Sequence, residues 1–150
     1  MVSRKLNAAN QRGQALAEFA IVVPVLMLIL GGIIQFGIIF WAQNTLTQVV
    51  RDTGRWAASQ QSCSATSPIV AKANAIAAQS SLIGYTTWTS GNVTVTWQTT
   101  NGACPPVSNQ ETSFVTVQIA HQVPIFFPLV PGNGSLVSSA QFRMEPVSAP

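Results

Sequence analysis

Residues 19–42 read FAIVVPVLMLILGGIIQFGIIFWA, and this stretch decides the fold because its 24 residues carry no formal charge. An α-helix of that length, at about 1.5 Å per residue, would be about 36 Å long, whereas a bilayer's hydrocarbon core is about 30 Å thick. A cleaved secretory signal has a shorter apolar region and ends in small residues. Here Trp41 lies near the end, and Gln43 and Asn44 follow the run. The sequence therefore predicts one retained transmembrane helix, which Pro24 is expected to kink.

The distribution of charge predicts the orientation of this helix. Arg4, Lys5 and Arg12 precede the run without an acidic residue, while Arg51 and Arg55 follow it. Because basic residues are retained on the cytoplasmic side, the N-terminus is expected in the cytoplasm. We therefore expect a single-pass protein of the cytoplasmic (inner) membrane whose C-terminal domain is extracytoplasmic and whose partners include the lipid bilayer.

The composition argues against several classes of function. The net charge is +3, but all of that excess lies in the N-terminal leader, so no basic patch for nucleic acid follows from the pI of about 9.4. The chain has one histidine and two cysteines without a CxxC pair, too few ligands for structural zinc. No nucleophile–base pattern predicts an enzyme. We expect neither catalytic activity nor a metal or other cofactor.

A processing motif stands where the leader meets the apolar run. Residues 12–19 read RGQALAEF: a short basic leader ends in Gly13, Glu18 lies five residues further on, and an aromatic residue follows it. This pattern resembles the processing site of type IV prepilins. The resemblance implies that a prepilin peptidase cuts between Gly13 and Gln14 on the cytoplasmic side. A glycine before the scissile bond lets an extended backbone enter a peptidase cleft.

Glu18 has two interpretations. Its carboxylate either lies in the lipid headgroup region or has a function, since unpaired carboxylates at the edge of an apolar span are costly. The resemblance favours a function, because in the family the carboxylate at the fifth mature position pairs with the N-terminal amine of a neighbouring subunit. Pairing removes the cost of burying either charge alone in an apolar assembly.

The resemblance extends along the chain to the TadE-like family, the pseudopilins or minor pilins of the tight-adherence (Flp) pilus and secretion system. It is carried by RGQALAEFAIVVPVLMLILGGIIQFG, by RDTGRWAA (residues 51–58) and by QFRMEP (residues 141–146). It implies a prepilin peptidase, other pilins or pseudopilins and the pilus assembly platform as partners. These residues do not separate the TadE-like from the TadF-like branch. The alternative is an unprocessed, signal-anchored protein with a small extracytoplasmic binding domain.

The remaining periodicities predict an α+β, pilin-like fold. Apolar residues at helical spacing extend the first helix to about residue 60, with Trp56 on its buried stripe. Ser67 and Pro68 predict the start of a second, short helix, and Gly84 can end it. Three alternating segments predict a small antiparallel sheet with one face on a helix. Their inward residues are Val93, Val95 and Trp97; Val115, Val117, Ile119, His121 and Val123; and Ala140, Phe142 and Met144.

We accordingly divide the chain into four parts. Residues 1–13 are the basic cytoplasmic leader, 14–42 the transmembrane helix, 43–62 its extramembrane continuation, and 63–150 the small extracytoplasmic domain. Cys63 and Cys104 enclose a 42-residue loop, and outside the cytoplasm a disulfide between them is expected.

The glycines of the apolar run and the proline-rich run each have two interpretations, and His121 has one. Gly31, Gly32 and Gly37 are either ordinary membrane glycines or sites of close packing between helices. His121 is expected to be a structural histidine. The run PIFFPLVPG, residues 124–132, is too rich in proline for a strand interior. It is either a loop folded over the core or an exposed contact for partner subunits.

Overall fold

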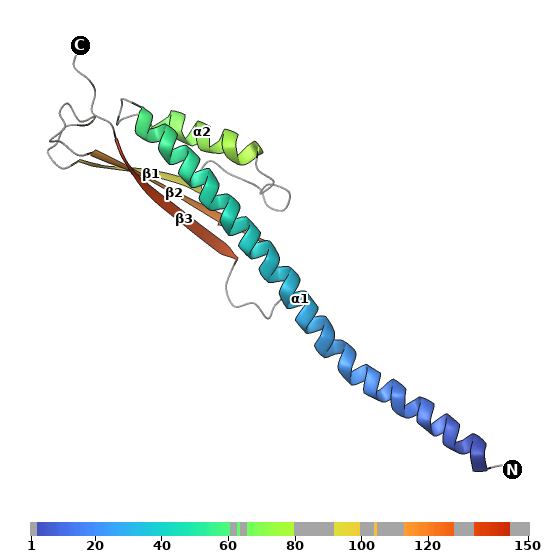
Figure 1. Cartoon of the computed structure of the whole chain (residues 1–150). Helices are drawn as coiled ribbons and strands as arrows, with labels where there is room; N and C mark the ends of the chain where they lie inside the picture. Colours follow the sequence, from blue (N-terminus) through green and yellow to red (C-terminus); the bar gives the residue numbers. More distant parts are fainter. Residues whose placement is uncertain are drawn as a thin grey trace.

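A computed structural model describes residues 3–60, 63, 66–79, 92–99, 104, 113–127 and 134–144, with side chains from Gly13 onward. In these residues a long helix, a short helix and a three-stranded sheet follow one another along the chain (Figure 1). The elements are α1 (Ser3–Ser59), α2 (Thr66–Gln79), β1 (Val93–Thr99), β2 (Ser113–Gln122) and β3 (Ser135–Arg143). The predicted α+β architecture is therefore confirmed.

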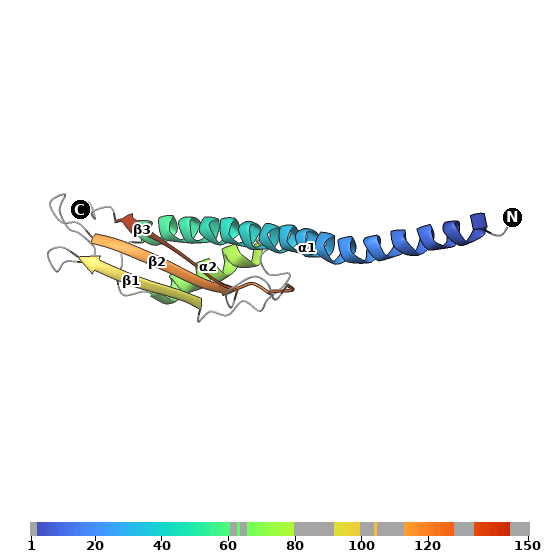
Figure 2. The same cartoon turned by 90° about the horizontal axis from the view of Figure 1, so that it is seen from below.

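The long helix α1 has two environments. It is continuous from Ser3 to Ser59, through Pro24, and it ends one residue before the predicted position. Its first half extends away from the rest of the chain, while its second half lies along the sheet and α2 (Figures 1 and 2). One helix thus forms both the projecting half and part of the folded unit, which we call the head.

The sheet is antiparallel with the order β1-β2-β3. In the centre of the sheet Val117 pairs with Val95 on one side and with Ala140 on the other. The alternation predicted from Val115 onward is confirmed, because every second residue of β2 from Ser113 to His121 is buried. β3 begins at Ser135, upstream of its predicted alternation.

The core of the head lies between the two helices and one face of the sheet. α1 packs on β2 and β3, and α2 packs on β1 and on α1. Trp56 packs against this core, as its place on the helical stripe predicted. The buried residues of the core are Leu46, Val49, Val50, Ala57, Ile69, Ala73, Ala77, Val93, Val115, Val117 and Ile119.

A glycine of α1 allows the end of β3 to approach the helix closely. A Cβ atom at Gly54 would overlap the ring of Phe142, so the ring occupies the space that any other residue would need. Gly54 belongs to RDTGRWAA and Phe142 to QFRMEP. The two segments that carried the resemblance on either side of the head are therefore in contact.

The start of α2 lies close to its predicted position, whereas its predicted end is not described. α2 begins at Thr66, one residue before the predicted cap at Ser67. The predicted end of α2 at Gly84 lies outside the described residues, as do residues 128–132 of the proline-rich run.

Candidate processing and assembly site

The two residues flanking the predicted cleavage site lie inside α1. Gly13 and Gln14 are exposed, and beyond the adjoining residues and the nearby backbone of α1 nothing lies within 4 Å of the place where a Cβ of Gly13 would stand. The backbone is helical here, whereas the predicted cleavage needs an extended backbone. A glycine inside a helix is about 1 kcal/mol less favourable than alanine, so Gly13 makes local unwinding easier at this position.

Glu18 is directed back towards Gln14. Its Oε1 accepts a hydrogen bond from Nε2 of Gln14 at 3.2 Å, and both side chains are exposed. This geometry follows from the helix, because side chains tilt towards the N-terminal end and meet partners four residues earlier. The structure thus brings two of the predicted site residues together and places the carboxylate over the helical turn that Gln14 would head after cleavage.

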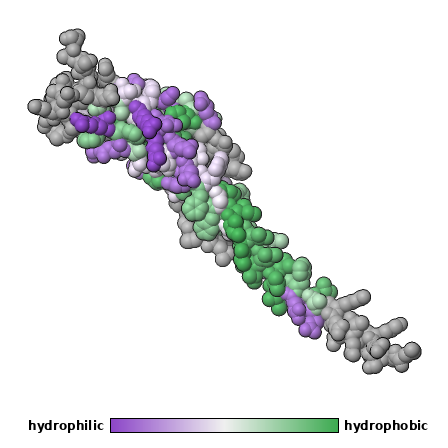
Figure 3. All heavy atoms as spheres, viewed as in Figure 1, coloured by the Kyte–Doolittle hydropathy of each residue, from purple (hydrophilic) through white to green (hydrophobic). Residues whose placement is uncertain are grey.

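Above Glu18 the surface of α1 is apolar. The helix is long and apolar enough to cross a membrane over part of the segment Gly13–Ser59. Figure 3 shows this hydrophobic stretch between a small hydrophilic patch and the more polar head. The exposed large apolar residues of α1 are Leu16, Phe19, Ile21, Val22, Val25, Leu26, Met27, Leu28, Ile29, Leu30, Ile33, Ile34, Phe36, Phe40 and Trp41.

Gln35, the amide within the apolar run, binds the segment after β2. Its side chain is 1% exposed. Its Nε2 donates a hydrogen bond to the backbone oxygen of Pro124 at 3.1 Å, and its Oε1 accepts one from the backbone N–H of Phe126 at 2.9 Å. No sequence pattern predicted a role for Gln35. The available signal was a single amide within the charge-free run 19–42, and its partners lie 89 and 91 residues away.

Gly31 supports the same contact one turn closer to the N-terminus. A Cβ at Gly31 would overlap the ring of Phe127, whereas Gly32 and Gly37 have nothing within 4 Å of theirs. Gly31 is thus a site of close approach, but its partner is a loop of the same chain; packing of these glycines against another helix stays a prediction. The described part of the proline-rich run is not a strand, as predicted. It packs on α1 at Gly31 and Gln35, on the N-terminal side of the core residues. The side chain of Phe126 is 60% exposed.

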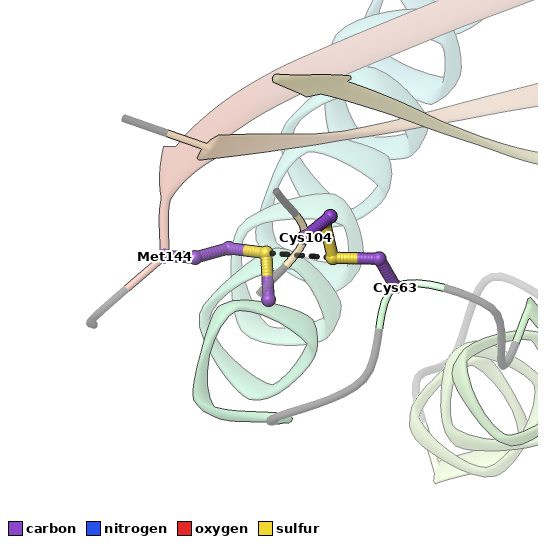
Figure 4. The surroundings of a disulfide bond; sticks show 3 residues. All are labelled: Cys63, Cys104 and Met144. Atoms are coloured by element: carbon purple, nitrogen blue, oxygen red, sulfur yellow. Dashed lines mark hydrogen bonds between the residues drawn. A yellow bond between two sulfur atoms is a disulfide. The ribbon is translucent and has the colours of Figure 1, made fainter. Parts of the chain in front are cut away.

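Cys63 and Cys104 come together at the far end of the head. Their sulfur atoms lie at bonding distance and their Cα atoms are 5.6 Å apart (Figure 4). Sδ of Met144 lies 3.6 Å from Sγ of Cys63, a van der Waals contact, since a sulfur atom in a disulfide carries no hydrogen to donate. Met144 is buried, and its N–H donates to the backbone oxygen of Ser113 at 2.8 Å.

His121 lies on the inward face of β2. Its side chain is 3% exposed, and burial lowers its pKa below the ordinary 6.5 because desolvation disfavours the imidazolium. Within the described residues, no group of three His, Cys, Asp or Glu side chains is placed to hold a metal ion.

Comparison with known proteins bears on the N-terminal half of the chain. A family model described as TadE-like protein matches residues 13–55, from the predicted cleavage site to the part of α1 that packs on the sheet. No curated protein and no solved structure matches the chain. The resemblance predicted from the motifs is thus confirmed over this segment: residues 13–55, which run from the start of the apolar half of α1 into the head, match the TadE-like family model.

Proposed function

We propose that this chain is a minor pilin or pseudopilin that takes part in assembly of a tight-adherence (Flp, type IVb) pilus. In this proposal a prepilin peptidase cuts after Gly13, and the processed chain joins other pilins and the assembly platform. The single observation that carries it is the TadE-like match at residues 13–55, which begins at the glycine of the processing motif.

The geometry at the start of α1 supports this proposal. Removal of residues 1–13 would take away the basic leader and leave the amine of Gln14 at the first turn of the helix. The carboxylate of Glu18 already lies over that turn, through its hydrogen bond to the Gln14 side chain. A carboxylate near a helix N-terminus is favoured by the helix dipole, and it is placed to accept a neighbour's amine. The exposed apolar surface above it suits both lipid and like helices.

Intact mass measurement of the membrane-extracted chain tests processing. With an active prepilin peptidase we expect an N-terminus at Gln14. A Gly13→Val variant is the control, because a β-branched residue hinders entry into the cleft, and it should keep the leader. A wild-type chain that retains Met1 or Val2 beside an active peptidase would be the unprocessed, signal-anchored alternative.

The role of Glu18 is tested by Glu18→Gln, which removes the charge and keeps the shape. We expect normal cleavage and a loss of pilus assembly, because the partner amine would remain uncompensated in an apolar bundle. Asp52→Asn is the matched control, since Asp52 is an exposed acid of the same helix. If the Glu18→Gln chain is processed and supports wild-type numbers of pili, the pairing role is wrong.

We also propose that Cys63 and Cys104 form a disulfide in the cell. The Cα separation of 5.6 Å fits such a bond, and an extracytoplasmic head would meet oxidising conditions.

A further inference from the structure

The segment Val123–Phe127, which follows β2 and which we call the apical loop, lies beside the apolar run of α1. It contacts this helix at Gly31 and Gln35. Both contacts precede Trp41, the aromatic residue expected at the outer membrane interface. The apical loop is therefore on the membrane side of the rest of the head, near the middle of α1 (Figure 2).

Helix length decides whether this loop can stay in water. With the cytoplasmic boundary at Glu18, a hydrocarbon core of about 30 Å takes about 20 residues, from residue 19 to residue 38. The residues wholly below the loop, 19–30, span only about 18 Å. A bilayer that stopped below the loop would have to thin by about 12 Å. In a bilayer of ordinary thickness, Gln35 lies about 5 Å and Gly31 about 11 Å inside the outer boundary.

Three backbone polar groups of the loop have a protein partner, as irregular structure at that depth requires. Such a backbone is tolerated only where its polar groups are satisfied by protein, because lipid offers no partners. Gln35 satisfies the carbonyl of Pro124 and the N–H of Phe126, at 3.1 and 2.9 Å. Pro124 has no N–H, and the N–H of Val123 donates to the carbonyl of Gly134 at 2.9 Å.

The large exposed side chains of the loop and of α1 at the same level are apolar and uncharged. Phe126 is 60% exposed, and none of the residues 123–127 carries a charge. On α1 at the same level, Ile33, Ile34 and Phe36 are 64%, 61% and 50% exposed. Phe126 thus exposes an aromatic ring at the same level along α1 at which the helix exposes apolar side chains.

We propose that the apical loop is embedded in the outer leaflet, where Phe126 contacts lipid acyl chains. The protein then meets the bilayer through two elements, and the Gln35 amide is the internal partner that makes the second one possible. This inference rests on the membrane anchoring within the proposed function and is independent of pilus assembly.

Spin labelling of the full chain in vesicles of phosphatidylcholine and phosphatidylglycerol tests the proposal. A nitroxide is attached to a Phe126→Cys variant under non-reducing conditions. The wild-type chain, treated with the same reagent, gives the background signal from Cys63 and Cys104. Because Phe126 is exposed, the substitution leaves the Phe127 contact with Gly31 in place. Collision rates with oxygen, which concentrates in lipid, and with a water-soluble nickel chelate report the depth.

Two further labelled variants calibrate the measurement. Ile29→Cys lies on the exposed face of α1, 56% exposed, close to the expected bilayer centre. Ser139→Cys lies on the exposed face of β3, next to Ser138, whose hydroxyl contacts Thr47 of α1. It is therefore expected about 13 Å above the outer boundary. The label at position 126 should resemble the Ile29→Cys label in oxygen access and should be at least tenfold less accessible to nickel than the Ser139→Cys label.

Three results would overturn the proposal. Nickel access at position 126 equal to that of Ser139→Cys would place the loop in water. Low access to both reagents, with dipolar broadening that disappears on dilution with unlabelled chain, would mean that a second copy covers Phe126. An Ile29→Cys label accessible to nickel would disprove the anchoring itself, so failure of the anchor and failure of the loop insertion are distinguishable.

Discussion

At the scale of single residues, Gln35 connects two parts of the chain that are otherwise far apart in sequence. Its amide satisfies one acceptor and one donor of the apical loop while being fully withdrawn from the surface. A neutral hydrogen bond contributes about 1 kcal/mol, but a buried group left without its partner costs about 1–3 kcal/mol. Loss of this side chain therefore has a larger effect than its two bonds suggest.

Gln35→Leu should release the apical loop without weakening the anchor, because the run becomes more apolar. We expect about 10- to 100-fold faster hydrogen exchange at the amide of Phe126, which corresponds to the lost partner. Hydrogen–deuterium exchange mass spectrometry of the full chain in nanodiscs measures this. Gln48→Leu, at an exposed position of the same helix, is the control. Unchanged protection in Gln35→Leu would show that the loop is held by other contacts.

Gly31→Ala should destabilise the loop contact, because the new methyl group overlaps the ring of Phe127. Overpacking of this kind costs about 1–3 kcal/mol. The adjacent Gly32→Ala has open space around it and should be neutral or stabilising by up to about 1 kcal/mol through helix propensity. Chemical denaturation of the detergent-solubilised chain, followed by tryptophan fluorescence, compares the two. Equal effects of the two substitutions would argue against the ring contact.

At the scale of elements, local patterns predicted the helices and strands well. Alternation from Val115 onward and the helical stripe through Trp56 are visible within short windows, because burial on one face repeats with the period of the element. The contact of Gln35 with Pro124 has no such period. It depends on how the apical loop returns to α1 across 89 residues, and neither segment alone indicates the other.

Among the connections between elements, the Cys63–Cys104 pair links the segment between α1 and α2 to the segment between β1 and β2. Cys63→Ser together with Cys104→Ser should lower the unfolding free energy by about 4 kcal/mol on the chain-entropy model for such a loop. The midpoint of denaturation of the wild-type chain should fall on addition of reductant, while that of the double variant should not move. A wild-type midpoint insensitive to complete reduction would exclude a stabilising disulfide.

At the scale of the whole molecule, the head does not fold around its own residues alone. Leu46, Val49, Val50 and Ala57 of α1 are buried in the same core cluster as the β2 residues. Charge and hydropathy of the sequence predicted the division into leader, span, continuation and domain, but those quantities do not report which side chains share a core. The C-terminal part of α1 is therefore structurally part of the head.

A chain beginning at Trp41 should therefore fold cooperatively, whereas a chain beginning at Gln60 should not, because it lacks every core residue of α1. Circular dichroism during thermal unfolding measures this. The chain from Trp41 should give one sigmoidal transition with helix and strand signal. A cooperative transition in the chain from Gln60 would show that the α1 side chains are dispensable for the core.

The continuous helix has a consequence for how neighbouring molecules meet. Because α1 runs without interruption from Ser3 to Ser59 and its last turns are packed into the head, the two parts cannot swivel independently. The head packs on one side of this part of α1, and the opposite side, with Gln48, Asp52 and Arg55, stays exposed. If the apolar half of α1 spans a membrane, a rotation of the helix there would turn the head by the same angle. Copies that pack side by side through the exposed side of α1 would therefore have the same rotational orientation about the helix axis. The arrangement of their heads would then be set by helix contacts made within the lipid.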